Sequence, residues 1–151
     1  MVNDAQDSPQ SGRFVGGEHR FACRVYYEDT DATGVVYHAS YIRFIERARS
    51  DMLHIAGIDQ RAAHERGDGV YAVAELSIRY RRPAKLDDDL LIRSRVIRTQ
   101  AASVRIHQKV MRAEELLAEA DVKAAFVSPD GRPRRQPNQW IDIFRNLTGA
   151  E

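Results

Sequence analysis

The sequence predicts an α+β fold in which one long helix packs on a largely antiparallel sheet. Two observations support this prediction. Apolar residues recur at helical spacing over one long segment, 37–55, and alternate with polar residues in several shorter segments around it. The alternating segments after the helix are joined by short turns, which favours antiparallel pairing between them.

The first strand is expected at about 20–27, where apolar and polar residues alternate. The long helix then has an apolar stripe made of Tyr41, Phe44, Ile45, Ala48, Met52 and Ile55. On its opposite face Arg47 and Asp51 are four residues apart and are expected to form an ion pair. Gly57 is a plausible end of this helix, and a short helix is expected at about 59–66.

Further strands are expected near 75–80, 90–96, 104–110 and 116–127. The last of these segments begins with two leucines and is rich in alanine, so a helix is the alternative there. Asp130 and Gly131 indicate a turn. A final helix is predicted from Trp140, Ile141, Phe144 and Leu147, with Asn138 as its N-cap.

The chain has 151 residues, which suits one domain. Residues 1–17 are polar and glycine-rich and are expected to form a flexible leader, and one domain is expected at 18–147. A net charge of +1 provides no overall field for binding nucleic acid or an anionic membrane. No segment approaches the length of a membrane span. The single cysteine, Cys23, favours a reducing compartment, so a cytoplasmic location is expected.

The predicted architecture also suggests an oligomer. One sheet packed on one helix leaves edge strands and apolar surface uncovered. A second copy of the chain would cover them, so a homo-oligomer is expected.

Several common catalytic signatures are absent from the sequence. It has no Gly-x-Ser-x-Gly nucleophile elbow and no glycine-rich phosphate loop. Its five histidines lack metal-binding spacing, so neither a metal nor another cofactor is expected. Cys23 lies on the apolar side of a predicted strand, which favours a buried structural thiol.

The segment between the first strand and the long helix carries three carboxylates, Glu28, Asp29 and Asp31. Two interpretations are open. An aspartate there could form an Asx-turn or cap a helix. Alternatively, one carboxylate faces a substrate carbonyl that is polarised by the free amides of the helix N-terminus.

Segments 26–31 and 34–41, which read YYEDTD and GVVYHASY, resemble the signature of the 4-hydroxybenzoyl-CoA thioesterase family. The resemblance continues through Phe44 and Glu46–Arg49 and through the segment 80–88, YRRPAKLDD, and covers about 21–129. Within the family, the sequence is most similar to acyl-CoA thioesterases associated with the Tol–Pal system.

The resemblance implies a hotdog fold, in which a curved antiparallel sheet wraps around one long central helix, and a homodimer or homotetramer with active sites shared between subunits. It implies hydrolysis of acyl-CoA, with Asp31 as the catalytic carboxylate and the backbone N–H of His38 directed at the thioester oxygen. Gly34 and Val35 would shape the connecting turn.

Further residues are candidates for substrate contact. Tyr37 and Tyr41 flank the turn, although Tyr41 also belongs to the apolar stripe, which favours a place in the core. Arg82 and Lys85, with Arg81, form a basic cluster that would suit the phosphates of coenzyme A, or would simply be a solvated patch.

Three questions stay open from the sequence. Thr33 stands where close relatives often have glycine, and a positive φ would strain a β-branched residue. Glu46 is a rival catalytic carboxylate on the long helix, with a solvated or ion-paired role as the alternative. The competing functions are a hotdog enoyl-thioester hydratase or dehydratase and a non-catalytic adaptor for acyl-CoA or acyl carrier protein.

Overall fold

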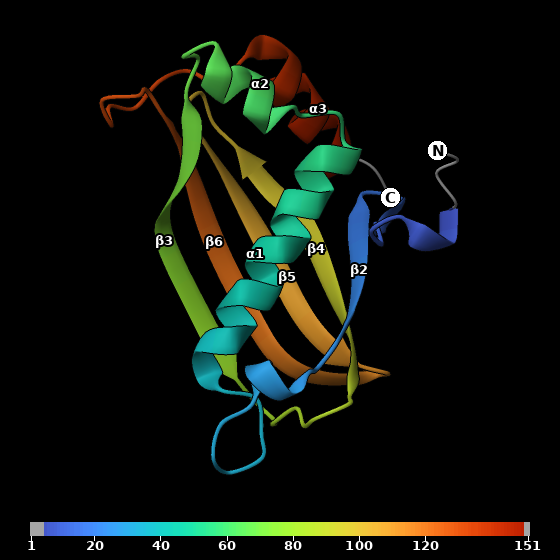
Figure 1. Ribbon diagram of the computed structural model, residues 1–151. Helices are drawn as coiled ribbons and strands as arrows, with labels where there is room; N and C mark the ends of the chain where they lie inside the picture. Colours follow the sequence, from blue (N-terminus) through green and yellow to red (C-terminus); the bar gives the residue numbers. More distant parts are fainter. Residues whose placement is uncertain (1–4, 150–151) are drawn as a thin grey trace.

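Six antiparallel strands form a single sheet that carries the helices of the chain (Figure 1). The computed structural model describes residues 5–149. Within that range the strands are β1 (Arg13–Val15), β2 (Glu18–Arg24), β3 (Val70–Tyr80), β4 (Asp89–Thr99), β5 (Ser103–Arg112) and β6 (Glu115–Val127). The α-helices are α1 (His38–Ile55), α2 (Gln60–Glu65) and α3 (Asn138–Gly149), and short 3-10 helices occur at η1 (Ala5–Asp7) and η2 (Tyr27–Asp29).

The strands lie in the order β1-β2-β4-β5-β6-β3. The predicted strands are therefore confirmed, including the alanine-rich β6, in which buried residues alternate with mostly half-buried ones and which does not form a helix. β3 pairs only with β6 and forms one edge of the sheet. Its side chains are mostly exposed, in contrast to those of β5 and β6.

The core lies between α1 and one face of the sheet. The predicted stripe of α1 is buried except for Ile55, which is partly exposed. Around the first half of α1, Tyr41, Phe44, Ile45 and Ala48 pack in one cluster with residues of β2, β4, β5 and β6. Around its second half, Met52 and Leu53 pack with Trp140 and Phe144 of α3. α3 therefore closes this end of the core. Full burial of each large apolar side chain contributes about 1.5–3 kcal/mol to the stability of the fold.

The three predicted α-helices are present. α1 is the longest, and the expected short helix and final helix are α2 and α3, which pack at the end of the sheet near the C-terminus of α1 (Figure 1). The sheet therefore carries several helices and not the long central helix alone. Gly57 has a φ of 91° just after α1, as a helix-terminating glycine should. Asp59 caps α2 by accepting a bond from the Ala62 amide at 3.0 Å. The predicted N-cap Asn138 is instead the first helical residue of α3.

Two local predictions were wrong because other contacts compete. The first strand ends at Arg24, and the chain then turns through η2, which leaves the Tyr27 side chain 83% exposed. Asp51 does not pair with Arg47. Its carboxylate is bonded to the buried His19 at 2.7 Å and to the Gly12 amide at 2.8 Å.

The segment expected to be a flexible leader contains structure. Arg13–Val15 form β1, which pairs with β2, and the Phe14 ring packs edge-on against His19. Residues 1–4 of that expected leader lie outside the described residues, and the boundary between 17 and 18 stays a prediction. Within residues 5–149, no helix is long and apolar enough to cross a membrane.

Candidate active site

The candidate site begins with the turn that carries Asp31 into α1. The Asp31 amide donates to the Val35 carbonyl at 2.9 Å, and the Gly34 amide donates to the Asp31 carbonyl at 3.1 Å. Gly34 has a φ of 83°, which glycine adopts without strain. Thr33 is not among the described residues with positive φ, so glycine is not required at that position in this chain.

The Asp31 carboxylate is exposed and is held by one neighbour. Its Oδ1 accepts hydrogen bonds from the Thr33 amide at 2.8 Å and from the Thr33 hydroxyl at 2.5 Å. These two bonds, the hydroxyl first, hold the pKa of Asp31 below its ordinary value, and His38 adds to the effect. The Asx-turn geometry expected of a structural aspartate is therefore present. Its Oδ2, however, accepts no hydrogen bond from a neighbouring residue in the described chain.

Next to this turn, α1 begins with amides that have no acceptor. The Tyr37 amide donates to Asp29 and the Ser40 amide to Tyr37, but no described residue accepts a bond from the amides of His38 or Ala39. The first amides of a helix carry partial positive charge. The turn and the helix start therefore place an anionic carboxylate and free hydrogen-bond donors close together in the chain.

A cavity of about 290 Å³ adjoins the start of α1, lined by Val36, His38, Tyr41, Tyr80, Arg81, Arg82 and Pro83. Tyr80 contacts two other lining residues: its hydroxyl donates to the His38 carbonyl at 2.8 Å, and its ring lies 5.3 Å from that of Tyr41. Tyr41 is only 3% exposed, and its hydroxyl accepts a bond from the Ala84 amide at 3.0 Å. Tyr41 thus belongs to the core and also closes the floor of this cavity.

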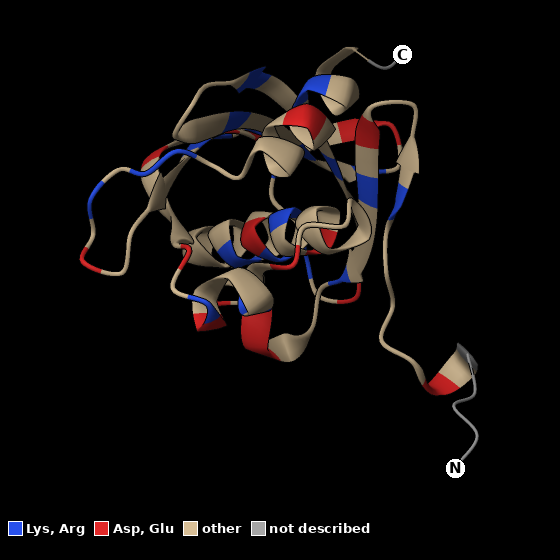
Figure 2. Cartoon of the chain, turned by 90° about the horizontal axis from the view of Figure 1, so that it is seen from above, with Lys and Arg blue, Asp and Glu red and all other residues tan. Residues whose placement is uncertain are grey.

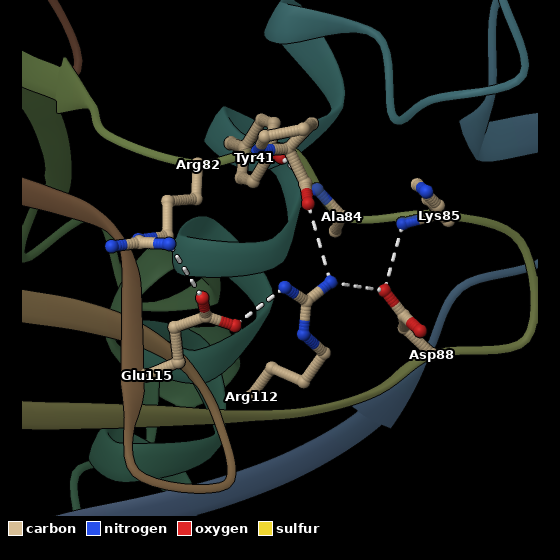
Figure 3. Close-up of polar contacts among 8 residues, drawn as sticks. Tyr41, Arg82, Ala84, Lys85, Asp88, Arg112 and Glu115 are labelled. Atoms are coloured by element: carbon tan, nitrogen blue, oxygen red, sulfur yellow. Dashed lines mark hydrogen bonds and ion pairs between the residues drawn. The ribbon is translucent and has the colours of Figure 1, made fainter.

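The basic cluster is organised by a residue that the sequence did not single out, Arg112 (Figure 3). Its guanidinium donates to the Pro83 carbonyl at 3.2 Å, to Asp88 at 2.7 Å and to Glu115 at 2.5 Å. Arg82 pairs with the same Glu115 at 3.2 Å.

The Lys85 amide donates to Asp88, while its side chain is exposed and has no ion pair within 4 Å among the described residues. The segment 83–88 is therefore held by backbone contacts that leave the Lys85 ammonium in solvent.

The predicted site residues are only partly brought together. His38, Tyr41 and Arg82 line one cavity. Gly34 and Val35 shape the turn but do not line the cavity, and Val35 forms an isolated β-bridge with Lys85. The exposed Tyr37 ring lies 4.5 Å from the His38 ring. Asp31 lies on the protruding turn, outside the cavity as one chain forms it.

The other candidate catalytic side chains, Asp29, Glu46 and Cys23, lie outside this cavity. Asp29 is buried and accepts a bond from the Tyr26 amide at 2.9 Å, which is a capping role. Glu46 lines a separate cavity on the side of α1 that faces β3. Burial raises the pKa of the Cys23 thiol to about 11, with Asp29 adding to the effect, so the thiol is protonated at neutral pH. Within residues 5–149, no three or more His, Cys, Asp and Glu residues cluster as metal ligands would.

Sequence reasoning missed Thr33, Tyr80 and Arg112 as parts of the site. Thr33 was noted only as a departure from the family pattern. Tyr80 was noted as a strand residue and as the start of the segment YRRP that carries the resemblance, but not as a site residue. Arg112 is distant in the sequence from both motifs, and only the pairing of β5 with β4 and β6 brings it to them.

Comparison with known proteins gives consistent results. A family model described as the thioesterase-like superfamily matches residues 25–143. The acyl-CoA thioester hydrolase YbgC of Escherichia coli is 40% identical over 128 residues, covering 83% of this chain and 95% of that protein. The acyl-CoA thioesterase YbgC of Helicobacter pylori is 38% identical over 137 residues, covering 85% and 98%.

Solved structures agree with the architecture. A probable thioesterase from Bartonella henselae superposes with a TM-score of 0.74 at 38% identity, covering 80% of this chain and 98% of that one. A 4-hydroxybenzoyl-CoA thioesterase in complex with 4-hydroxybenzoyl-CoA has a TM-score of 0.77 at 21% identity, covering 84% and 98%, and so supports the fold alone. The chain belongs to the thioesterase-like superfamily and has its hotdog fold.

Proposed function

We propose that this protein hydrolyses acyl-CoA thioesters to a free acid and coenzyme A, with Asp31 as the catalytic carboxylate. Curated relatives with this activity, 40% identical in the case of Escherichia coli, support the reaction. The observation that carries the assignment to Asp31 is that its Oδ2 and the nearby amides of His38 and Ala39 have no hydrogen-bond partner among residues 5–149.

The chemistry follows from these two groups. An ordinary aspartate titrates near pH ~4, and Thr33 lowers the pKa of Asp31 further, so the carboxylate is ionised at neutral pH. Its Oδ2 attacks the thioester carbon, the C–S bond breaks, and coenzyme A leaves as a thiolate that takes a proton from solvent. Water then hydrolyses the mixed anhydride. In the second possible route, Asp31 takes a proton from the attacking water.

Either route places negative charge on the thioester oxygen. The amides of His38 and Ala39 at the N-terminus of α1 stabilise that charge as an oxyanion hole does. Only the backbone of His38 is needed for this role. Its imidazole, tilted against the Tyr37 ring, contributes to the lowered pKa of Asp31.

Coenzyme A would bind along the basic segment next to the cavity of Tyr41 and Tyr80. The exposed Lys85 ammonium has no competing ion pair within 4 Å among the described residues, so it is the first phosphate contact we propose. Arg82 is second, because a phosphate must compete with Glu115 for its guanidinium.

A second copy of the chain completes the site in this proposal. Asp31 is exposed in one chain, whereas carboxylate catalysis on a thioester benefits from a site closed to water. The edge strand β3 exposes Val70, Val73, Leu76 and Tyr80, each more than a third accessible. Such an apolar edge is suited to pairing with another chain, so we propose a homodimer, with a homotetramer as the possible larger assembly.

The decisive experiment replaces Asp31 with asparagine. Asparagine can still accept the Thr33 bonds but is neither nucleophilic nor basic, so acyl-CoA hydrolysis should fall by about a hundredfold or more. Release of thiol from a panel of acyl-CoAs measures this, with Glu28→Gln in the same turn as the matched control. Retained turnover in a folded Asp31→Asn variant would contradict the proposal.

Three further attributes stay predictions. The cytoplasmic location is based on the single cysteine, Cys23. An association with the Tol–Pal system, or delivery of the acyl group by acyl carrier protein, is based only on the family resemblance.

A further inference from the structure

Arg49 is a buried cation with no carboxylate partner among residues 5–149. Its side chain lies on α1, is 7% exposed, and makes one hydrogen bond, from Nη1 to the Gln108 Oε1 at 2.9 Å. No carboxylate among the described residues lies within 4 Å of it. A buried charge without a counterion is strongly unfavourable, so the arrangement is incomplete as one chain presents it.

The guanidinium is nevertheless held in place. Gln108 is fully buried, and its Nε2 donates hydrogen bonds to the Ile45 carbonyl and the Ser94 hydroxyl, both at 2.9 Å. Its remaining oxygen is thereby oriented toward Arg49. A guanidinium has five N–H donors, and Gln108 accepts from only one of its nitrogens. Gln108 thus holds the Arg49 guanidinium in place, and the guanidinium still has N–H groups without an acceptor among the described residues.

Arg49 lines a cavity of about 240 Å³ between α1 and the strands β3, β5 and β6. Apolar side chains such as Leu53, Val104 and Ile106 line it, and its charged lining residues are Arg49 and Glu46. Glu46 is exposed and has no hydrogen bond or ion pair with any described residue. Burial lowers the pKa of Arg49, and Glu46 opposes that shift only from a distance.

The strand β3, which forms one wall of the cavity, exposes large apolar side chains. Leu76 and Tyr80 of β3 pair with Val122 and Ala118 of β6, which are core residues, so they lie on the same face of the sheet as α1. Both are nevertheless more than a third exposed. Val73 of β3, which lines the cavity with Glu46 and Arg49, is also exposed. Exposed apolar side chains of β3 therefore lie at the cavity and farther along the same strand, and no described residue covers them.

We propose that a second copy of this chain covers the cavity through its own α1, and that the Glu46 of each copy pairs with the Arg49 of the other. The inference rests on the homodimer proposed above and adds the residues that hold it together. It also gives Glu46 an assembly role in place of a catalytic one.

Symmetry makes the pairing self-consistent. Glu46 and Arg49 lie in the middle turns of α1 and are separated by about 4.5 Å along its axis. When two copies of one helix cross antiparallel about a two-fold axis near their midpoint, residue i meets residue j and residue j meets residue i. One contact therefore forms twice, and both buried guanidinium groups acquire a carboxylate.

The test measures assembly, which does not depend on thioesterase activity. Glu46→Gln and Arg49→Met should each raise the dimer dissociation constant about a hundredfold, since each removes two desolvated ion pairs. Sedimentation equilibrium measures this constant, and circular dichroism checks folding. Arg47→Met, on another face of α1, and Glu65→Gln in α2 are matched controls that should leave it unchanged. If Arg49→Met does not fold, Arg49→Gln, which can still bond Gln108, replaces it.

Glu46 and Arg49 are three residues apart on α1, so they could also pair within one chain. Mixing the two variants distinguishes an ion pair between chains from one within a chain. A heterodimer of Glu46→Gln with Arg49→Met keeps one intact pair between chains, so it should form in preference to either homodimer and bind about tenfold more tightly. A random distribution of dimers would overturn the proposal, as would a monomeric wild-type protein. A third outcome would also overturn it. Dimerisation would be unchanged in Arg49→Met, and this variant would lose hydrolysis of glutaryl-CoA but keep hydrolysis of pentanoyl-CoA. Arg49 would then bind the free carboxylate of an acyl group.

Discussion

The Gly12→Ala substitution tests whether the N-terminal strand is an integral part of the fold. The Gly12 amide donates to the Asp51 carboxylate at 2.8 Å, next to the buried His19. A Cβ atom at this position would meet the Arg20 carbonyl, and it would lie 2.8 Å from both Asp51 Oδ2 and His19 Nε2. The backbone carbonyl cannot move without disturbing β2, so residue 12 must shift and β1 must move with it.

The expected loss follows from the contacts that depend on residue 12. A hydrogen bond to a charged group contributes about 1.5–3 kcal/mol, and an aromatic contact such as Phe14 with His19 about 0.5–1.5 kcal/mol. Alanine also lowers the conformational entropy of the unfolded chain, which stabilises the folded state by about 0.4–1 kcal/mol and offsets part of the loss. The free energy of unfolding should therefore fall by about 1–4 kcal/mol, which lowers Tm by about 2–4 °C for each kcal/mol.

Chemical denaturation and calorimetry measure both quantities. Gly149→Ala is the matched control, because no described atom outside the backbone of its own helix lies within 4 Å of its added Cβ. It should leave the unfolding free energy nearly unchanged. If Gly12→Ala is as stable as the wild-type protein and the control, then β1 and the Gly12–Asp51 bond contribute nothing, and residues 1–17 are the dispensable leader that the sequence predicts.

Two further predictions concern the site. Thr33→Val removes the hydroxyl that lowers the pKa of Asp31, so the acid limb of the pH–rate profile should move to higher pH. Activity should then be lost earlier as pH falls, while Thr33→Ser should restore the wild-type profile; an unmoved acid limb in Thr33→Val would refute this. Arg112→Leu breaks the contacts with Pro83, Asp88 and Glu115 and should lower the unfolding free energy by about 1–2 kcal/mol, since the site is partly exposed. Arg132→Leu, at a mostly exposed ion pair of 3.6 Å, should have no measurable effect in the same denaturation experiment, and an equal loss in both variants would count against the role of Arg112.

Element types were predictable because they depend on local periodicity. The stripe of α1 and the alternation in β4, β5 and β6 are repeated patterns that one buried face imposes on the sequence. β1 was missed because three residues carry too little pattern, and its place depends on Gly12 and Phe14 meeting Asp51 and His19. Charges of both signs are interspersed over α1 and the sheet (Figure 2), so spacing alone could not identify which ones pair. Asp51, for example, contacts His19, 32 positions away, and not Arg47.

The sequence by itself determined the fold class, the family and the candidate carboxylate, because the motif around Asp31 is continuous in the chain. The tertiary structure decided how the charged groups are used. It placed Tyr80 against His38, brought Arg112 to the segment 83–88, and buried Arg49 beside Gln108 without a counterion among the described residues. These contacts join residues that are 24 to 59 positions apart, and their energies depend on burial and strand register, which local sequence patterns do not encode.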